Sequence, residues 1–244
     1  GLKDCEAVIL PMPLSGDGTW VNSPFSLERA SVPQCLGAMG PGTAVFAGKV
    51  DSKTQQLAEG LGLLLTDYLE REELAIHNAR ITAEGTLEIA FQELAVAVFQ
   101  LPCLILGHGR VAKALIQVFN GVGADLSVAA RKYSDLAQIQ LEGCKPIPFH
   151  QLEKALPDTK LLINTVPSQI LGKEQLALLP RDTLLIDLAS RPGGICMEEA
   201  AAQGLKAIWA LSLPGKCAPI SAGEIILQTI ENCVAEQEAL SWKN

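Results

Sequence analysis

The stretch of sequence that decides the fold is Leu104-Ile105-Leu106-Gly107-His108-Gly109-Arg110-Val111-Ala112. Its three aliphatic residues are typical of a buried strand, and the apolar spacing that continues to Phe119 predicts a helix directly after the glycines. In the dinucleotide-binding motif G-x-G-x-x-G, the first glycine permits a tight turn and the second lets the backbone approach a pyrophosphate. The third position serves close helix packing, and an alanine is tolerated there. We therefore predict a phosphate loop at the start of a helix, formed by Gly107, His108, Gly109, Arg110, Val111 and Ala112.

Two details of this loop stay open. The side chain of His108 is expected to face phosphate or solvent rather than to transfer a proton. The alternative for the whole motif is a glycine turn in an α/β domain that binds no cofactor.

Strands and helices alternate regularly after residue 100. The strand candidates are residues 102–106, 126–130, 146–148, 161–165, 184–188 and 207–211. The helical stretches between them are residues 110–119, 134–140, 151–156, 173–179 and 197–203. Alternation with short connections favours a parallel sheet covered on both faces. We predict an α/β protein, with a doubly wound Rossmann sheet and a second, smaller α/β domain.

The predicted domains follow the change in pattern along the chain. Residues 1–83 are rich in Pro and Gly and hold short apolar runs at 7–10, 43–48 and 62–65, which predicts a substrate-side α/β domain that we expect to be incomplete at its start. It includes a helix over 52–60 capped by Asp51 or Ser52. Apolar residues at steps of three and four predict a crossover helix over 84–100. The Rossmann domain then covers 101–216, and 217–244 forms a helix that returns to the first domain.

Composition and charge exclude several classes of function. Hydrophobic residues make up 48% of the chain, charged residues 19%, and the net charge is −8 with no run of Lys and Arg. Nucleic acids and anionic membranes both require a concentrated positive field, so we expect neither as a partner. The longest apolar stretch, 94–106, is interrupted by Gln100 and Pro102 and is too short to cross a bilayer. The seven Cys and three His residues show no ligand spacing, so we expect no metal site and a reduced, cytoplasmic protein.

The end of the second Rossmann strand indicates which dinucleotide binds. NAD sites place Asp or Glu there for the ribose 2′-hydroxyl, whereas this chain has Arg131 and Lys132, with Ser134 close behind. A guanidinium can pair with a 2′-phosphate through two hydrogen bonds. These residues favour NADP; the alternative for Arg131 is a solvated charge at the end of a strand.

Polar clusters follow the later strands, where the nicotinamide and substrate would lie. The predicted cofactor residues there are Asn164, Thr165, Val166, Pro167, Asp187, Leu213 and Pro214. The predicted substrate residues are Arg191, Thr165, Ser168 and His77. Arg191 is suited to hold a substrate carboxylate, and its alternative is a structural ion pair, for example with Asp187. His77 is expected just before the crossover helix, with a purely structural role as its alternative.

Several of these segments together resemble one family. They are Asn164 to Ser168, Asp187-Leu188-Ala189-Ser190-Arg191-Pro192-Gly193-Gly194, Leu213-Pro214-Gly215 with Ala218-Pro219, Asn78 to Thr86, Ala130-Arg131 and, more loosely, Val8 to Pro11. In these segments the chain resembles the A subunit of bacterial dipicolinate synthase, over nearly its whole length.

The resemblance implies an NADP-linked dehydrogenase that converts a dihydrodipicolinate-type ring, written as 4-hydroxy-tetrahydrodipicolinate, to dipicolinate for the spore. It also implies that the partner is a flavoprotein B subunit, and that the location is the mother-cell cytoplasm. In this family Arg191 would hold one substrate carboxylate, with Thr165 and Ser168 near the ring. We further expect a homo-oligomer.

Two other functions stay open. D-L-A-x-x-G-G also resembles the nucleotide domains of alanine dehydrogenase and transhydrogenase, although Arg131 disfavours the NAD-linked alanine enzyme. The third possibility is an NADP-binding subunit without catalysis that stabilises or regulates a partner.

Overall fold

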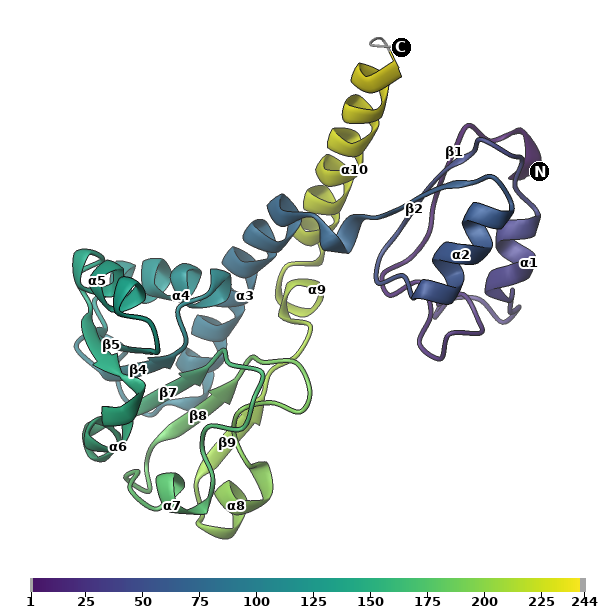
Figure 1. Ribbon diagram of the computed structural model, residues 1–244. Coiled ribbons are helices and arrows are strands. Elements are labelled where there is room, and N and C mark those ends of the chain that lie inside the picture. The colour runs from purple at the N-terminus through teal and green to yellow at the C-terminus, as the bar shows by residue number, and fades with distance from the viewer. Residues whose placement is uncertain (1, 242–244) are drawn as a thin grey trace. The chain divides into compact units, whose positions relative to one another are not determined.

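The computed structural model describes residues 2–241, with side-chain surroundings for residues 2–237. The chain divides into two compact units, one formed by Gly1–His77 with Gly223–Asn244 and the other by Asn78–Ala222 (Figure 1). The first boundary lies six residues before the predicted one at 83/84, and the second lies six residues after 216/217. No helix within the described residues has the length and apolar character that a bilayer crossing requires.

The larger unit contains a six-stranded parallel sheet in the order β6-β5-β4-β7-β8-β9. Its strands are β4 (Pro102–Leu106), β5 (Asp125–Ala130), β6 (Lys145–Pro148), β7 (Leu161–Asn164), β8 (Leu184–Asp187) and β9 (Lys206–Trp209). The chain runs outward from β4 to β6, crosses back to β7 beside β4, and continues to β9 (Figure 1). This is the order of a doubly wound dinucleotide-binding sheet, and it confirms the predicted fold class.

Both faces of this sheet are covered, because alternate residues of the strands feed two separate cores. Cys103 and Ile105 belong to the core under the long helices, while Leu104 and Leu106 belong to the core on the opposite face. The helices of this unit are α4 (Arg110–Gly121), α5 (Tyr133–Leu141), α6 (Leu152–Ala155), α7 (Lys173–Leu176), α8 (Met197–Ala202) and α9 (Leu213–Cys217). Short 3-10 turns at Phe149–Gln151 and Leu156–Asp158 flank α6.

The crossover helix differs from its prediction. Helix α3 spans Glu72–Glu93, so it begins well before residue 84 and ends before residue 100. Glu72 and Glu73 occupy its first turn, where negative charge complements the helix dipole. Val98 and Leu101 continue the apolar spacing but enter the core from the turn after the helix, where Gln100 has a φ of 58°. The pattern therefore identified Ala90, Val98 and Leu101 as buried, but it was wrong for Phe91, which is 59% exposed, and for the helix bounds.

The smaller unit contains a three-stranded parallel sheet of β1 (Ala7–Ile9), β2 (Ala44–Ala47) and β3 (Leu64–Asp67) in that order. Helix α2 (Ser52–Gly60) starts at Asp51, whose carboxylate accepts a hydrogen bond from the Thr54 amide. Helix α1 (Val32–Gly37) was not predicted, although Ser31 and Gln34 form a capping box at its start. Short 3-10 turns span Leu2–Asp4 and Tyr68–Glu70.

The C-terminal helix α10 (Pro219–Ser241) packs with the smaller unit through Ile230 and Cys233. These side chains share a buried cluster with Phe46, Tyr68 and Leu74.

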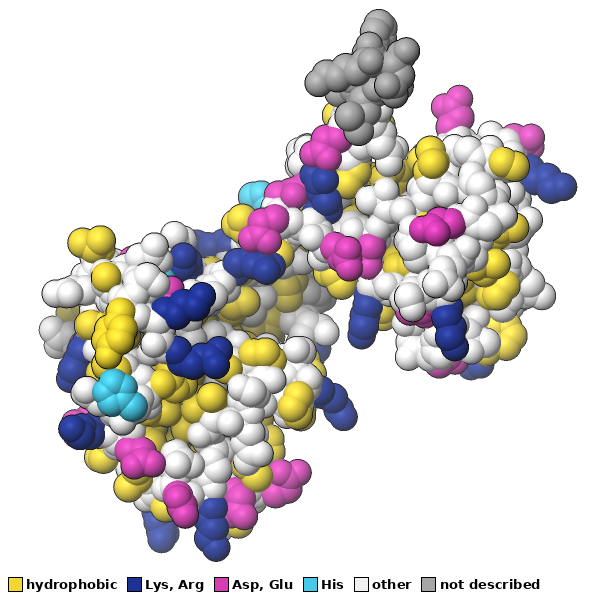
Figure 2. Space-filling model, viewed as in Figure 1, with side chains coloured by type: hydrophobic (Ala, Val, Ile, Leu, Met, Phe, Trp, Pro, Cys, Tyr) yellow, Lys and Arg dark blue, Asp and Glu magenta, His cyan; other side chains and the backbone are white. Residues whose placement is uncertain are grey.

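The face drawn in Figure 2 carries Lys and Arg side chains interspersed with Asp and Glu.

Candidate functional site

The predicted phosphate loop lies at the carboxyl end of β4, next to β7, where the strand order reverses. Gly107 has a φ of 99°, a conformation that L residues rarely adopt. A side chain at this position would meet Thr165, because a Cβ atom would lie 2.6 Å from the Thr165 Oγ1 atom. Gly107 is therefore required both by its backbone conformation and by the close approach of the β7 end.

The start of α4 offers room for a phosphate group. Gly109 is the N-cap residue, no side chain caps the first turn, and a Cβ atom at Gly109 would meet nothing within 4 Å. Ala112, in contrast, is completely buried against the core. The open backbone at Gly109 and the uncapped helix start fit a dinucleotide pyrophosphate. Arg110 and Val111 lie in the same first turn of α4.

The environment of His108 corrects the expectation that it faces phosphate or solvent. Its side chain has no exposed surface, and Nε2 lies 3.1 Å from the Glu142 Oε2 atom. Nδ1 lies 4.0 Å from the Asp135 Oδ1 atom and has no hydrogen-bond partner within the described part of the chain. His108 therefore connects the phosphate loop to α5, which carries Asp135, and to Glu142 directly after that helix.

The residues predicted for the 2′-phosphate follow β5 at the same edge of the sheet. Arg131 and Lys132 are exposed between β5 and α5, and Ser134 is exposed in the first turn of α5. No side chain caps the start of α5, which leaves its first amides available to an anion. The strand ends at Ala130 without a carboxylate at the position that would favour a ribose hydroxyl.

Polar side chains at the end of β7 fix the backbone there through hydrogen bonds. The Thr165 hydroxyl donates a hydrogen bond to the Leu106 carbonyl at 2.7 Å, which joins the ends of β7 and β4. Asn164 is completely buried, and its Nδ2 atom donates to the Val166 carbonyl at 3.0 Å. Val166 is partly exposed, while Pro167 and Ser168 are exposed. The backbone after β7 is thus fixed, and Pro167 and Ser168 remain accessible to a ligand.

Asp187 at the end of β8 organises the loop that follows it. Its carboxylate is completely buried and accepts hydrogen bonds from Asn164 Nδ2 at 2.7 Å and from the Ala189 amide at 3.0 Å. It also accepts the amides of Gly194 at 2.8 Å and Ile195 at 3.0 Å. These four donors occupy both oxygens, so Asp187 shapes the loop that follows β8.

The two glycines of this loop are explained by the same carboxylate. Gly193 has a φ of 82°, and a Cβ atom there would lie 2.9 Å from Asp187 Oδ2. A Cβ atom at Gly194 would collide with the Asn164 amide group. The segment from Asp187 to Gly194 is therefore a loop folded around a buried carboxylate and amide.

Arg191 lies on the outside of this loop. Its guanidinium stacks on the ring of Trp209 with 5.4 Å to the centroid, and the Trp209 Nε1 atom donates to the Ala189 carbonyl at 2.8 Å. The alternative ion pair of Arg191 with Asp187 is wrong, because Asp187 is enclosed by other donors. Trp209 was missed in the sequence, although an aromatic residue at the end of the sixth strand was a usable signal.

The remaining predicted residues lie elsewhere. Leu213 and Pro214 begin helix α9 rather than a loop, and the Leu213 side chain is buried in the core beside Gly85 of α3. The Leu213 side chain therefore belongs to the core, and a contact of the backbone at Leu213 and Pro214 with a cofactor stays a prediction. His77 is exposed within α3, not before it, and it is the last residue of the first segment of the smaller unit.

Comparison with known proteins shows the family to which this chain belongs. Residues 1–69 match the model of the N-terminal domain of the dipicolinate synthase A subunit. The A subunit of dipicolinate synthase from Bacillus subtilis (strain 168) is 33% identical over 243 residues, which is 99% of this chain and 82% of the relative. The chain belongs to the family of dipicolinate synthase A subunits.

Solved structures agree with this membership. The A chain of dipicolinate synthase from Bacillus subtilis superposes with a TM-score of 0.89 at 31% identity, covering 98% of this chain and 80% of that one. The transhydrogenase of Sinorhizobium meliloti superposes with a TM-score of 0.75 at 17% identity, covering 97% and 75% of the two chains. The fold of the dipicolinate synthase family is thus shared with a transhydrogenase at low sequence identity.

Proposed function

We propose that this protein is the NADP-dependent dehydrogenase subunit of a dipicolinate synthase. The observation that carries the proposal is the 33% identity to the A subunit of dipicolinate synthase over 99% of the chain. The reaction starts from 4-hydroxy-tetrahydrodipicolinate, which loses water to give the dihydropyridine dicarboxylate. That ring then gives a hydride to the oxidised cofactor and releases a proton, which leaves the aromatic dicarboxylate dipicolinate.

The cofactor proposed for this site is NADP, which supplies the hydride acceptor when bound. The backbone from Gly107 to Ala112 would hold the pyrophosphate at the start of α4. Arg131, Lys132 and Ser134 would hold the 2′-phosphate, because the β5 end has cations and a hydroxyl and no carboxylate. The nicotinamide end would lie along Asn164 to Pro167, whose backbone the buried side chains fix.

The substrate residues proposed here are Arg191, Thr165, Ser168 and His77. Arg191 is exposed, and its stacking on Trp209 orients the guanidinium without using its hydrogen-bond donors. Those donors suit one carboxylate of the ring. Ser168 is exposed beyond the β7 end and suits a polar contact with the ring.

The partner proposed for this protein is the B subunit of the synthase, a flavoprotein, with the mother-cell cytoplasm during sporulation as the location. We also propose that the protein forms a homo-oligomer. Size-exclusion chromatography with light scattering, with and without the B subunit, measures both associations.

The proposal is tested by mixing the protein, with the B subunit present, with NADP and freshly made 4-hydroxy-tetrahydrodipicolinate. We expect the absorbance of reduced nicotinamide to rise together with dipicolinate. NADP binding in calorimetry without any turnover would overturn the dehydrogenase and leave a non-catalytic NADP-binding subunit. Turnover with NAD and L-alanine instead would place the chain with alanine dehydrogenase.

The choice of NADP is tested with Arg131→Gln. Loss of a charge-assisted hydrogen bond of about 1.5–3 kcal/mol weakens binding by roughly 10- to 100-fold. We expect the Kd for NADP to rise by that factor while the Kd for NAD changes little. The matched control is Arg181→Gln, which removes an exposed arginine just before β8, at the opposite edge of the sheet. Equal effects of Arg131→Gln on both cofactors would contradict the 2′-phosphate assignment.

A further inference from the structure

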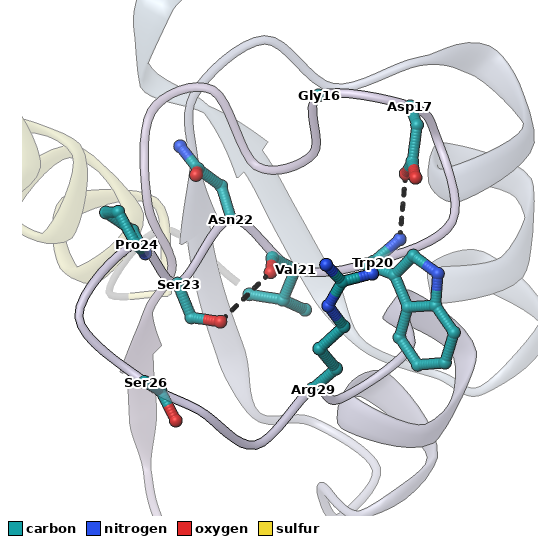
Figure 3. A pocket seen from close by; sticks show the side chains of 9 residues that line it. All are labelled: Gly16, Asp17, Trp20, Val21, Asn22, Ser23, Pro24, Ser26 and Arg29. Atoms are coloured by element: carbon teal, nitrogen blue, oxygen red, sulfur yellow. Dashed lines mark hydrogen bonds between the residues drawn. The ribbon is translucent and has the colours of Figure 1, made fainter.

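The smaller unit has two adjoining pockets at the carboxyl edge of its sheet. One has a volume of about 410 Å³ and lies within the loop between β1 and α1; Figure 3 shows the side chains around it. The other, of about 280 Å³, lies between that loop and the residues that connect β2 to α2. Gly16 lines both pockets. Ligands of open parallel α/β sheets bind at this edge, outside the carboxyl ends of the strands.

Lys49 lines the smaller pocket in a backbone conformation that lysine rarely adopts. It follows the end of β2 with a φ of 61°. Asp67, at the end of β3, holds this conformation by accepting the amides of Lys49 at 3.1 Å and Val50 at 2.7 Å. Strained residues of this kind cluster at binding sites, because the surrounding structure keeps them in place for a ligand.

Each pocket contains one cation without a protein partner. Within the described residues, neither the ammonium group of Lys49 nor the guanidinium group of Arg29 forms an ion pair or a hydrogen bond. Arg29 lines the larger pocket, and Figure 3 shows its side chain extending into the space that the loop encloses. The charge on both groups is therefore available to an anion.

The carboxylates of the same pockets are already engaged by the backbone. Asp17 accepts the amides of Thr19 at 2.8 Å and Trp20 at 3.0 Å, and these bonds keep the pKa of its carboxyl below the usual range. Asp51 accepts the Thr54 amide at 2.8 Å at the start of α2, which lowers the pKa of that carboxyl as well. Both carboxylates stabilise the loops that form the walls.

We propose that these pockets form an anion site, separate from the substrate site proposed at Arg191, in which Lys49 and Arg29 each bind a carboxylate of a small dicarboxylate. The identity of the ligand as pyridine-2,6-dicarboxylate or its hydrogenated precursors rests on the proposed function. Two cations in adjoining pockets suit a ligand with two carboxylates better than inorganic phosphate, which has a single anionic centre. Ser15 and Thr54 in the smaller pocket supply further polar groups.

The experiment titrates the full chain, carrying Arg191→Gln to remove the proposed substrate contact, with pyridine-2,6-dicarboxylate in a calorimeter, in the absence of NADP. We expect the Kd to rise about 10-fold or more for Lys49→Gln and for Arg29→Gln, as for loss of one charge-assisted contact. Lys49→Arg is expected to restore part of the affinity. Lys3→Gln, which removes an exposed charge of the same unit outside both pockets, is the control and should leave the Kd unchanged.

Several results would overturn the proposal. These are no binding by the Arg191→Gln protein, an unchanged Kd for Lys49→Gln, or phosphate binding as tight as that of the dicarboxylate. If Lys49→Gln fails to fold, Lys49→Gly removes the ammonium group and accepts the positive φ, and the same loss of affinity is expected. Because NADP and turnover are absent from this measurement, its outcome is separate from that of the dehydrogenase assay. Turnover with unchanged binding in the variants would contradict only this inference.

Discussion

At the scale of single residues, the most consequential side chain of the Rossmann unit is a carboxylate that pairs with no cation among the residues that the structure describes. Asp187 is completely buried and accepts hydrogen bonds from three backbone amides and the side chain of Asn164. Buried polar groups of this kind are costly to leave without a partner. The loop that carries Arg191 therefore depends on Asp187, although Asp187 touches no ligand group.

We predict that Asp187→Asn destabilises the larger unit and disorders this loop. An amide nitrogen in place of Oδ2 would oppose the amides of Gly194 and Ile195, leaving two buried donors without an acceptor at a cost of about 2–4 kcal/mol. Urea unfolding followed by circular dichroism measures this loss. Asp182→Asn, which alters an exposed carboxylate paired with Lys160, is the control with a small expected change. Similar stability of the two variants would contradict the role given to Asp187.

The residue scale also shows where sequence reasoning succeeds and fails. Gly107 and Gly109 were predictable, because a motif with its flanking strand and helix specifies backbone geometry. The stacking of Arg191 on Trp209 was not predictable, because Trp209 lies close to Arg191 in space but 18 residues away in the sequence, whereas Asp187 is close in the sequence. The burial of His108 was missed for the same reason, because Glu142 lies 34 residues away.

At the scale of elements, the long helices were harder to delimit than the strands. Strand β4 was predicted with its observed bounds, because a short apolar run between turn residues has clear ends. Helix α3 was misplaced, because its first turns carry charged residues and its apolar spacing continues into a turn. Apolar periodicity alone does not fix where a helix ends, because a helix and the turn after it can both place apolar residues of the same spacing in the core.

A second element-scale feature is the ion-pair network that connects the start of α3 to α10. Arg71 makes two hydrogen bonds to Glu236, at 2.8 and 2.7 Å, and pairs with Glu73 at 2.7 Å. The guanidinium keeps the pKa of both carboxyls below the usual range. A carboxyl with a lowered pKa in the folded state contributes stability above its unfolded pKa, about 4.3 for glutamate. That contribution is lost as the pH falls through the folded pKa.

We predict that Glu236→Gln lowers the melting temperature of the smaller unit at neutral pH and not in acid. The difference between the variant and the unaltered protein should shrink as the pH falls below about 4.3 and vanish below the folded pKa of Glu236. Differential scanning calorimetry across this pH range measures it. Glu231→Gln, an exposed glutamate of the same helix, is the matched control. A difference that grows in acid would contradict the network.

At the scale of the whole molecule, the two units have separate hydrophobic cores. The clusters around β1 to β3 and α10 share no residue with the clusters around β4 to β9. The boundaries fall inside elements, since His77 and Asn78 both belong to α3, and Ala222 and Gly223 both belong to α10. Separate cores allow each unit to open by itself, and a ligand that binds one folded unit stabilises that unit by mass action.

We therefore predict that each ligand protects a different set of backbone amides from hydrogen exchange. NADP at 100 times its Kd should slow exchange limited by unfolding of residues 78–222, by a factor that corresponds to about 2.7 kcal/mol. In the Arg191→Gln variant, which removes the proposed substrate contact of the larger unit, pyridine-2,6-dicarboxylate alone should protect residues 2–77 and α10. Peptides from the two ends of α3 separate these effects within one helix, because Ala79 and Ala83 pack in the Rossmann core and Leu74 packs with α10. Equal protection of both units by NADP alone would show that the two cores unfold as one.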